Sequence, residues 1–269
     1  MEIRDLSFRY AEAPVLNNIT TGIEKGRVTT IIGANGCGKS TLFNLMTKNL
    51  RPLGGGIYID NRNIKAIPLK EFAKTVAIVH QYNTAPRDAT VKDIVTYGRT
   101  PYTSLFRHIG AEDEEVIEWA MGITNIYELR DQPISLLSGG EKQRVWIAMA
   151  LAQKTEYLLL DEPTTHLDIK YQIQILDLVQ MLNTEFNMTI VMILHDINQA
   201  VHYSDTIIGM GCGEIIFQGA AEKIISSKNL YDIYQVELNV IDYFNNKYVL
   251  PMAAGYNKWG SFSPAVSGT

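Results

Sequence analysis

Residues 33–41 are Gly33-Ala34-Asn35-Gly36-Cys37-Gly38-Lys39-Ser40-Thr41, and an apolar, β-branched run from Val28 to Ile32 precedes them. A short run of this kind that ends at a glycine predicts a buried strand. The apolar side chains within residues 42–46 predict a helix that begins near Lys39. The glycine-rich stretch therefore connects a strand to a helix, as the phosphate-binding P-loop pattern requires.

A P-loop predicts a nucleotide site. Its glycines let backbone N–H groups turn inward around phosphate oxygens, next to the positive end of the helix. We expect Lys39 to reach the terminal phosphates and Ser40 to ligate Mg²⁺. Cys37 is interpreted as a loop residue rather than a nucleophile, because no base adjoins it in the sequence. The predicted phosphate cradle comprises Gly33, Asn35, Gly36, Cys37, Gly38, Lys39, Ser40 and Thr41.

Two adjacent carboxylates follow another apolar run. Tyr157 to Leu160 predicts a strand, and Asp161 and Glu162 stand at its carboxyl end, where open α/β sheets bind their ligands. Adjacent strand residues point to opposite sides, so the two carboxylates can take different tasks. We expect Asp161 to hold Mg²⁺ and Glu162 to polarise an attacking water.

Gln81 and His195 each follow a short apolar strand, Val76 to Val79 and Ile190 to Leu194. A lone glutamine or histidine at such a place is more often a cap or a loop residue. Parallel strands, however, bring their carboxyl ends to one edge of a sheet, where both side chains could meet the γ-phosphate. The residues alone leave both interpretations open.

Strands and helices alternate on both sides of a helical stretch that begins near Thr90. This pattern predicts an α/β fold with a mostly parallel sheet and an inserted helical lobe. From the P-loop and the short strands expected through Ile23, we also expect a P-loop NTPase core and an N-terminal antiparallel β subdomain. We expect one domain over residues 1–269, with the core in 1–89 and 154–225 and the lobe in 90–153. Gly54 to Gly56 is expected to interrupt the pattern before the strand Ile57 to Ile59. Residues 226–269 form a C-terminal extension without a readable motif.

Composition and charge indicate which classes of partner and compartment to expect. A net charge of -5 over 269 residues gives no basic footprint, so we expect no nucleic-acid partner. Two cysteines make no disulfide framework and favour a reducing, cytosolic compartment. We expect no signal peptide at the N-terminus, and no apolar run approaches the roughly 20 residues that span a bilayer. Any transport path must then come from another chain.

The run Leu137-Ser138-Gly139-Gly140-Glu141 narrows the function further. A serine at the start of a helix offers a hydroxyl and N–H donors to an anion. One ATP does not need two such cradles in one protomer, so the second would serve the ATP of a partner. The order of P-loop, Ser-Gly-Gly run and Asp161-Glu162 resembles the ATP-binding cassette (ABC) family, over roughly Met1 to Gly219.

The resemblance implies roles for further residues. Gln81 matches the Q-loop glutamine near Mg²⁺ and the attacking water, and His195 matches the switch histidine that contacts the γ-phosphate. Tyr10 matches the aromatic residue that stacks on adenine, with an ordinary edge-strand tyrosine as the alternative. The resemblance assigns Ser138, Gly139 and Gly140 to the signature motif, which is donated across a head-to-tail dimer. Residues 165–168 match the D-loop, in which Asp168 helps to couple the two ATP sites.

Two residues depart from the family pattern, and their effect on the dimer contacts stays open. Glu141 stands where glutamine is commoner, and His166 stands at a usual alanine position.

Finer runs are similar to one branch of the family. Residues 98–102, 144–153 and 161–169 resemble ATPases of iron–siderophore, haem and cobalamin importers, with the ferric siderophore members closest. The resemblance implies a peripheral protein on the cytoplasmic face of the membrane that hydrolyses ATP with Mg²⁺. Its expected partners are a second copy, two permease subunits and, indirectly, an extracellular or periplasmic substrate-binding protein. The segment after Gln81, through about Phe106, would dock a permease coupling helix, or form a plain helical lobe.

Three alternatives remain: a haem or cobalamin importer ATPase, a soluble cassette ATPase such as the iron–sulfur assembly type, and a nucleotide-dependent binding module without turnover. The presence of both Glu162 and His195 argues against the last.

Overall fold

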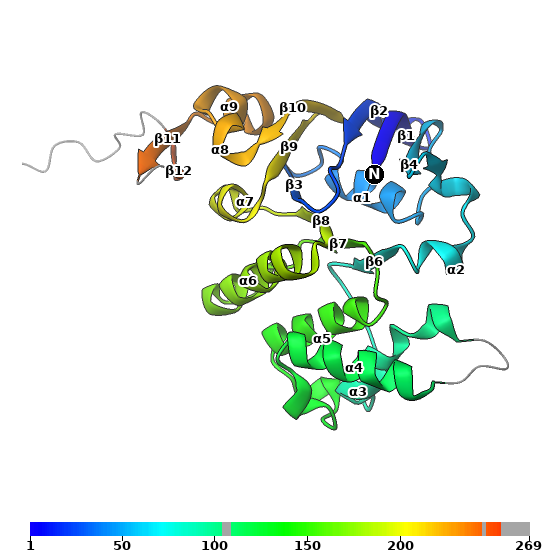
Figure 1. Cartoon of the computed structure of the whole chain (residues 1–269). Helices are drawn as coiled ribbons and strands as arrows, with labels where there is room; N and C mark the ends of the chain where they lie inside the picture. Colours follow the sequence, from blue (N-terminus) through cyan, green and yellow to red (C-terminus); the bar gives the residue numbers. More distant parts are fainter. Residues whose placement is uncertain (104–108, 244–245, 254–269) are drawn as a thin grey trace, which may run out of the picture.

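A six-stranded sheet forms the centre of the computed structural model, which describes residues 1–103, 109–243 and 246–253 (Figure 1). Its strand order is β10-β9-β3-β8-β7-β6. The neighbours from β9 to β6 are parallel, and β10 pairs antiparallel with β9. The strands are β3 (Val28–Gly33), β6 (Val76–Val79), β7 (Tyr157–Asp161), β8 (Thr189–Ile193), β9 (Thr206–Gly211) and β10 (Glu214–Ala220). The predicted mostly parallel sheet is confirmed.

A second, antiparallel sheet has the order β2-β1-β4-β5, as expected for the N-terminal subdomain. Helix α1 (Lys39–Met46) shares one buried core with it and with the central sheet, and its apolar residues Leu42, Phe43, Leu45 and Met46 are all buried there. The side of α1 that the sequence predicted to be apolar therefore joins the two sheets. The strands are β1 (Glu2–Tyr10), β2 (Ala13–Gly22), β4 (Gly54–Ile59) and β5 (Arg62–Asn63).

The expected interruption at Gly54 to Gly56 is wrong, because these residues begin strand β4. Strand β4 pairs with β1 through an irregular register between Arg4 and Ser7. Gly55 has a φ of +68°, and a Cβ there would lie 2.2 Å from the carbonyl oxygen of Arg4. Glycine thus permits the close approach that lets the pairing continue.

The helical lobe contains α3 (Val91–Tyr97), α4 (Ala111–Ile123) and α5 (Gly139–Leu151), shown in blue-green to green in Figure 1. Thr90 caps α3 in a capping box with Asp93, so the expected helix start is confirmed. A buried ion pair joins Arg99 Nε to Asp113 Oδ1 at 2.8 Å, and Arg99 also donates to the carbonyl of Ala152. This arginine ties the ends of three lobe segments together. The exact domain limits stay predictions.

The remaining helices complete the fold. Short elements are α2 (Leu69–Phe72) and the 3-10 turns Ile64–Ala66, Thr100–Tyr102, Tyr127–Leu129 and Ile134–Leu136. Helices α6 (Ile169–Phe186), α7 (Ile197–Tyr203), α8 (Ala221–Ile224) and α9 (Ser227–Tyr234) follow later in the chain. Within the described ranges, none of the helices is long and apolar enough to cross a membrane.

The C-terminal extension has structure that the sequence did not reveal. After α9, strands β11 (Leu238–Tyr243) and β12 (Asn246–Ala253) form an antiparallel pair, drawn in orange in Figure 1. The Asn198 side chain on α7 anchors it: the amide donates to the carbonyl of Val249 (3.0 Å) and accepts from its N–H (2.7 Å). Residues 254–269 lie outside the described residues.

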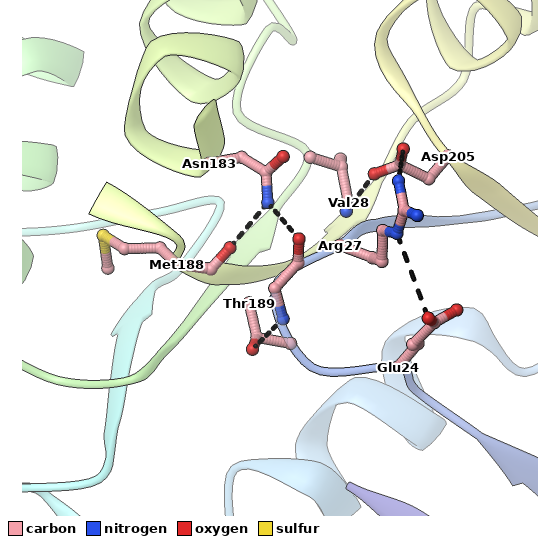
Figure 2. Close-up of polar contacts among 8 residues, drawn as sticks. Glu24, Arg27, Val28, Asn183, Met188, Thr189 and Asp205 are labelled. Atoms are coloured by element: carbon pink, nitrogen blue, oxygen red, sulfur yellow. Dashed lines mark hydrogen bonds and ion pairs between the residues drawn. The ribbon is translucent and has the colours of Figure 1, made fainter. Parts of the chain in front are cut away.

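Side chains tie together the amino ends of the parallel strands (Figure 2). Asp205, just before β9, accepts from the N–H of Val28 at 2.8 Å. Asn183 on α6 donates to the carbonyls of Gly26 (2.9 Å) and Met188 (2.8 Å). These contacts fix the start of β3 beside its neighbours, and therefore the position of the loop at its opposite end.

Candidate functional site

The glycine-rich loop connects β3 to α1, as predicted. Gly38 stands directly before α1 with a φ of +107°, and a Cβ there would lie 2.6 Å from the Leu16 side chain. At Gly33 a Cβ would lie 2.3 Å from the carbonyl oxygen of Met210. Only glycine fits both positions, so the loop turns tightly and its backbone can face a phosphate.

Lys39 turns its side chain back over this loop. Its Nζ donates to the carbonyls of Gly33 (2.8 Å) and Ala34 (3.0 Å), and the residue is buried. The charge therefore stands beside the positive end of α1, a setting that suits an anion. Cys37 is also buried, and burial raises the pKa of its thiol. A neutral thiol fits the interpretation of Cys37 as a loop residue.

Three predicted catalytic side chains meet at the carboxyl ends of β6, β7 and β8. Gln81 donates through Nε2 to Glu162 Oε2 at 2.6 Å, and His195 Nε2 lies 2.7 Å from Glu162 Oε1. Glu162 is mostly buried, whereas His195 is exposed. The polar ends of separate strands thus converge on one carboxylate, the arrangement that the sequence left open.

Thr165 is a member of this cluster that sequence reasoning missed. Its hydroxyl donates to Glu162 Oε2 at 3.1 Å, and its N–H donates to the Glu162 carbonyl at 3.2 Å. Glu162 itself has a φ of +51°, so the chain turns sharply after the strand. A threonine three residues after an acid is too common a pattern to have revealed this contact.

Asp161 fits a magnesium ligand. Its Oδ1 is buried and has no hydrogen-bond partner in the part of the chain that the structure describes. Burial, and secondarily the charge of Glu162, raises the pKa of Asp161 to about 6. A buried, unpaired carboxylate oxygen is the kind of atom that a hard cation would satisfy, and the hydroxyl of Ser40 and the amide oxygen of Gln81 are of the same ligand class.

Removing the Asp161 carboxylate is expected to stabilise the metal-free protein. Because its pKa rises from 3.8 to about 6 on folding, the ionised form costs folding free energy, and this cost grows between those two pH values and is complete above them. Asp161→Asn should therefore raise the midpoint of thermal unfolding, measured with a chelator, more at about pH 8 than at about pH 4. A midpoint difference that does not change with pH would contradict this.

The Ser138 run opens α5, as expected. Ser138 caps the helix, and both its N–H (2.8 Å) and its hydroxyl (2.7 Å) donate to Glu141 Oε2. These hydrogen bonds hold the pKa of Glu141 below its usual range. Gly140 lies under the Tyr171 ring, where a Cβ would come within 2.3 Å. Glu141 therefore occupies both the N–H and the hydroxyl of Ser138.

Tyr10 and Asp168 lie apart from these clusters. Tyr10 is half exposed, and its ring and the Phe8 ring form a T-shaped pair with their centroids 4.8 Å apart. Asp168 precedes α6 but does not cap it with its side chain, and it is exposed. Asp196 does cap α7, by accepting from the Gln199 N–H at 2.9 Å.

Comparison with known proteins identifies the family. A family model described as "ABC transporter" matches residues 16–165. The chain is 40% identical over 241 residues to the iron(3+)-hydroxamate import ATP-binding protein FhuC of Bacillus subtilis (strain 168), covering 90% of each chain. It is 42% identical over 237 residues to the ferric enterobactin transport ATP-binding protein FepC of Escherichia coli (strain K12), covering 88% of each.

Solved structures agree with this assignment. An inward-facing putative metal-chelate type ABC transporter matches with a TM-score of 0.81 at 27% identity, covering 95% of this chain and 98% of that one. The ATP-binding cassette MJ0796, in a dimeric post-hydrolysis state bound to ADP and phosphate, matches with a TM-score of 0.70 at 27% identity, covering 82% and 98%. The chain belongs to the ABC transporter family and is an ATP-binding cassette ATPase.

Proposed function

We propose that this ATPase powers the import of a ferric siderophore. The observation that carries the proposal is its similarity, near 40% identity over about nine-tenths of the chain, to ATP-binding proteins named for import of iron hydroxamates, enterobactin and petrobactin. The convergence of Gln81 and His195 on Glu162 supports turnover rather than binding alone, because a carboxylate so placed can orient water.

The residues of the site would have separate roles in ATP hydrolysis. The backbone of the P-loop and Lys39 would hold the β- and γ-phosphates of ATP. Ser40, Gln81 and Asp161 would hold Mg²⁺, which when bound neutralises charge on the phosphates. Glu162 would accept a hydrogen bond from the attacking water, and His195 would donate to the γ-phosphate. Because Gln81 and His195 now contact Glu162, both must turn toward the nucleotide as it binds.

A second copy of the chain would complete each ATP site. Ser138 and Gly139 are exposed at the start of α5, and helix starts of this kind bind anions. In the proposed head-to-tail dimer they face the γ-phosphate held by the partner. Glu141 must then release Ser138, and Asp168 and Tyr10 would contact the partner and adenine respectively.

A hollow lined in part by the segment that follows Gln81 is the proposed docking place for a permease. It measures about 480 Å³ and joins the segment after Gln81 to α5; its lining is Asn83, Thr84, Ala85, Arg87, Ile134, Ser135, Lys142 and Trp146. Tyr82 and Leu136 are exposed, as an apolar anchor for a partner helix would be. A helix seated here would move the segment that carries Gln81. The end of the expected docking segment, residues 104–106, lies outside the described residues.

Two permease subunits so docked would hold the ATPase dimer at the cytoplasmic face of the membrane. A substrate-binding protein on the other side would deliver the cargo.

Deletion of this ATPase is expected to stop uptake of iron from a labelled ferric siderophore while leaving surface binding of the siderophore unchanged. The chain would supply the energy for transport and would not recognise the siderophore. Only the energy-dependent uptake step should therefore fail. Cells that produce the Glu162→Gln variant, which retains the ATP-binding residues, should behave like the deletion strain. Uptake of siderophore iron, haem and cobalamin should be measured side by side.

The pattern of uptake separates the alternatives. Retained siderophore uptake with loss of haem or cobalamin uptake would contradict the cargo and keep the transport role. If the deletion strain retained uptake of siderophore iron, haem and cobalamin, the transport role would be contradicted, and a role such as iron–sulfur assembly would take its place.

A further inference from the structure

Two glutamine side chains connect the turn after Glu162 with the helix after His195. Gln172 lies in the first turn of α6 and Gln199 in the first turn of α7, and both are half-buried. Gln199 Nε2 donates to Gln172 Oε1 at 2.7 Å, and Gln172 Nε2 donates to the Leu167 carbonyl at 2.8 Å. The Thr164 hydroxyl donates to Gln199 Oε1 at 3.4 Å.

These hydrogen bonds form an open chain in which every donor points the same way along it, and we call this chain, from Thr164 to Leu167, the circuit. Each amide oxygen accepts from the preceding member and each amide nitrogen donates to the next, from Thr164 through Gln199 and Gln172 to Leu167. Neither amide can rotate by half a turn without placing two donors or two acceptors against each other. The circuit therefore holds both ends of the loop Thr164–Leu167 against the start of α7.

Both ends of the circuit adjoin residues of the site. Within the loop, Thr165 contacts the Glu162 carboxylate. On α7, the N–H of Gln199 is the group that Asp196 caps, directly after His195. The signature run lies close to this loop, because a Cβ added to Gly139 would lie 3.4 Å from the Leu167 side chain.

We propose that Gln172 and Gln199 are positioning residues that hold the D-loop and the helix after His195 in one fixed arrangement. Glu162 and His195 then approach the γ-phosphate together, and a movement of the D-loop on dimer closure reaches His195 through the two amides. This inference rests on the proposed roles of Glu162 and His195 in hydrolysis.

Replacement of either glutamine by methionine tests the circuit. Methionine keeps the length of the side chain and lacks the amide, so Gln199→Met and Gln172→Met should each lower kcat about fivefold, the worth of one hydrogen bond. The KM for ATP should stay within about twofold, because neither side chain touches the nucleotide. The double variant should be no slower than either single variant, since one break already interrupts the circuit.

The matched control is Gln180→Met. Gln180 lies on α6 and reaches across to the carbonyl of His202 on α7 at 3.5 Å, but it lies away from the D-loop. Gln180→Met should therefore leave kcat unchanged. Gln199→Glu keeps the acceptor for Thr164 and loses the donor to Gln172. It should lower kcat as much as Gln199→Met does, which would show that the decrease does not come from a packing defect in the methionine variant.

The outcomes distinguish this inference from the function on which it rests. Unchanged kcat in both single variants, or losses that multiply in the double variant, would overturn the circuit. If Glu162→Gln, assayed in parallel, still hydrolysed ATP, the proposed catalytic roles themselves would fail.

Discussion

Replacement of Lys39 by alanine is expected to abolish both tight ATP binding and ATP hydrolysis. The Lys39 amine already lies within the P-loop, held by the carbonyls of Gly33 and Ala34, and no neighbouring cation in the loop sequence can replace it. Loss of a buried charge that clamps phosphates should lower turnover by about a hundredfold or more. Binding of a fluorescent ATP analogue and release of phosphate would be measured together.

Lys48→Ala is the matched control for this variant. Lys48 follows α1 and donates to the carbonyl of Ile67, away from the loop. It should leave both measurements near the wild-type values. Turnover at the wild-type rate in Lys39→Ala would show that the loop does not hold the reacting phosphates.

Glu162→Gln is expected to bind ATP and hydrolyse it extremely slowly. Glutamine keeps an acceptor oxygen for Gln81 or Thr165, but it loses the negative charge that lies beside His195 and that would polarise water. Removal of a general base should lower turnover by between about a hundredfold and ten-thousandfold. Single-turnover phosphate release, with ATP binding measured on the same sample, would check this.

The control here is Glu156→Gln, at the residue directly before strand β7. Glu156 is exposed and pairs with Lys25, so its variant should hydrolyse ATP normally. Equal activity in Glu162→Gln and Glu156→Gln would remove Glu162 from the reaction.

The fold could be predicted because it depends on local patterns. The run from Val28 to Thr41 combines a buried strand, glycines and a helix start, and parallel strands bring their carboxyl ends to one edge. The sequence could therefore suggest that Gln81 and His195 meet near the γ-phosphate, with a cap or loop role left open, and the structure adds that both contact Glu162. Their roles in catalysis, and that of Tyr10 at adenine, stay predictions.

Other features depend on contacts between segments that are distant in the sequence, and no local sequence pattern predicts them. The glutamines of α6 and α7 have the spacing of ordinary helix residues, and only packing brings Gln172 to Gln199. The strand pair after α9 is short and lies over Asn198, a contact about fifty residues away in the chain. A glycine run also suits a turn, so the sequence predicts an interruption at residues 54–56, whereas pairing with β1 makes these residues part of strand β4.

The trans position of the signature motif is the central claim, and one measurement tests it. Light scattering during size-exclusion chromatography in Mg²⁺-ATP should give Glu162→Gln twice the 30.2 kDa mass of one chain. Adding Ser138→Arg should return the mass to that of one chain, because a bulky cation would fill the place meant for the partner's γ-phosphate. A stable dimer of Glu162→Gln with Ser138→Arg would contradict the account.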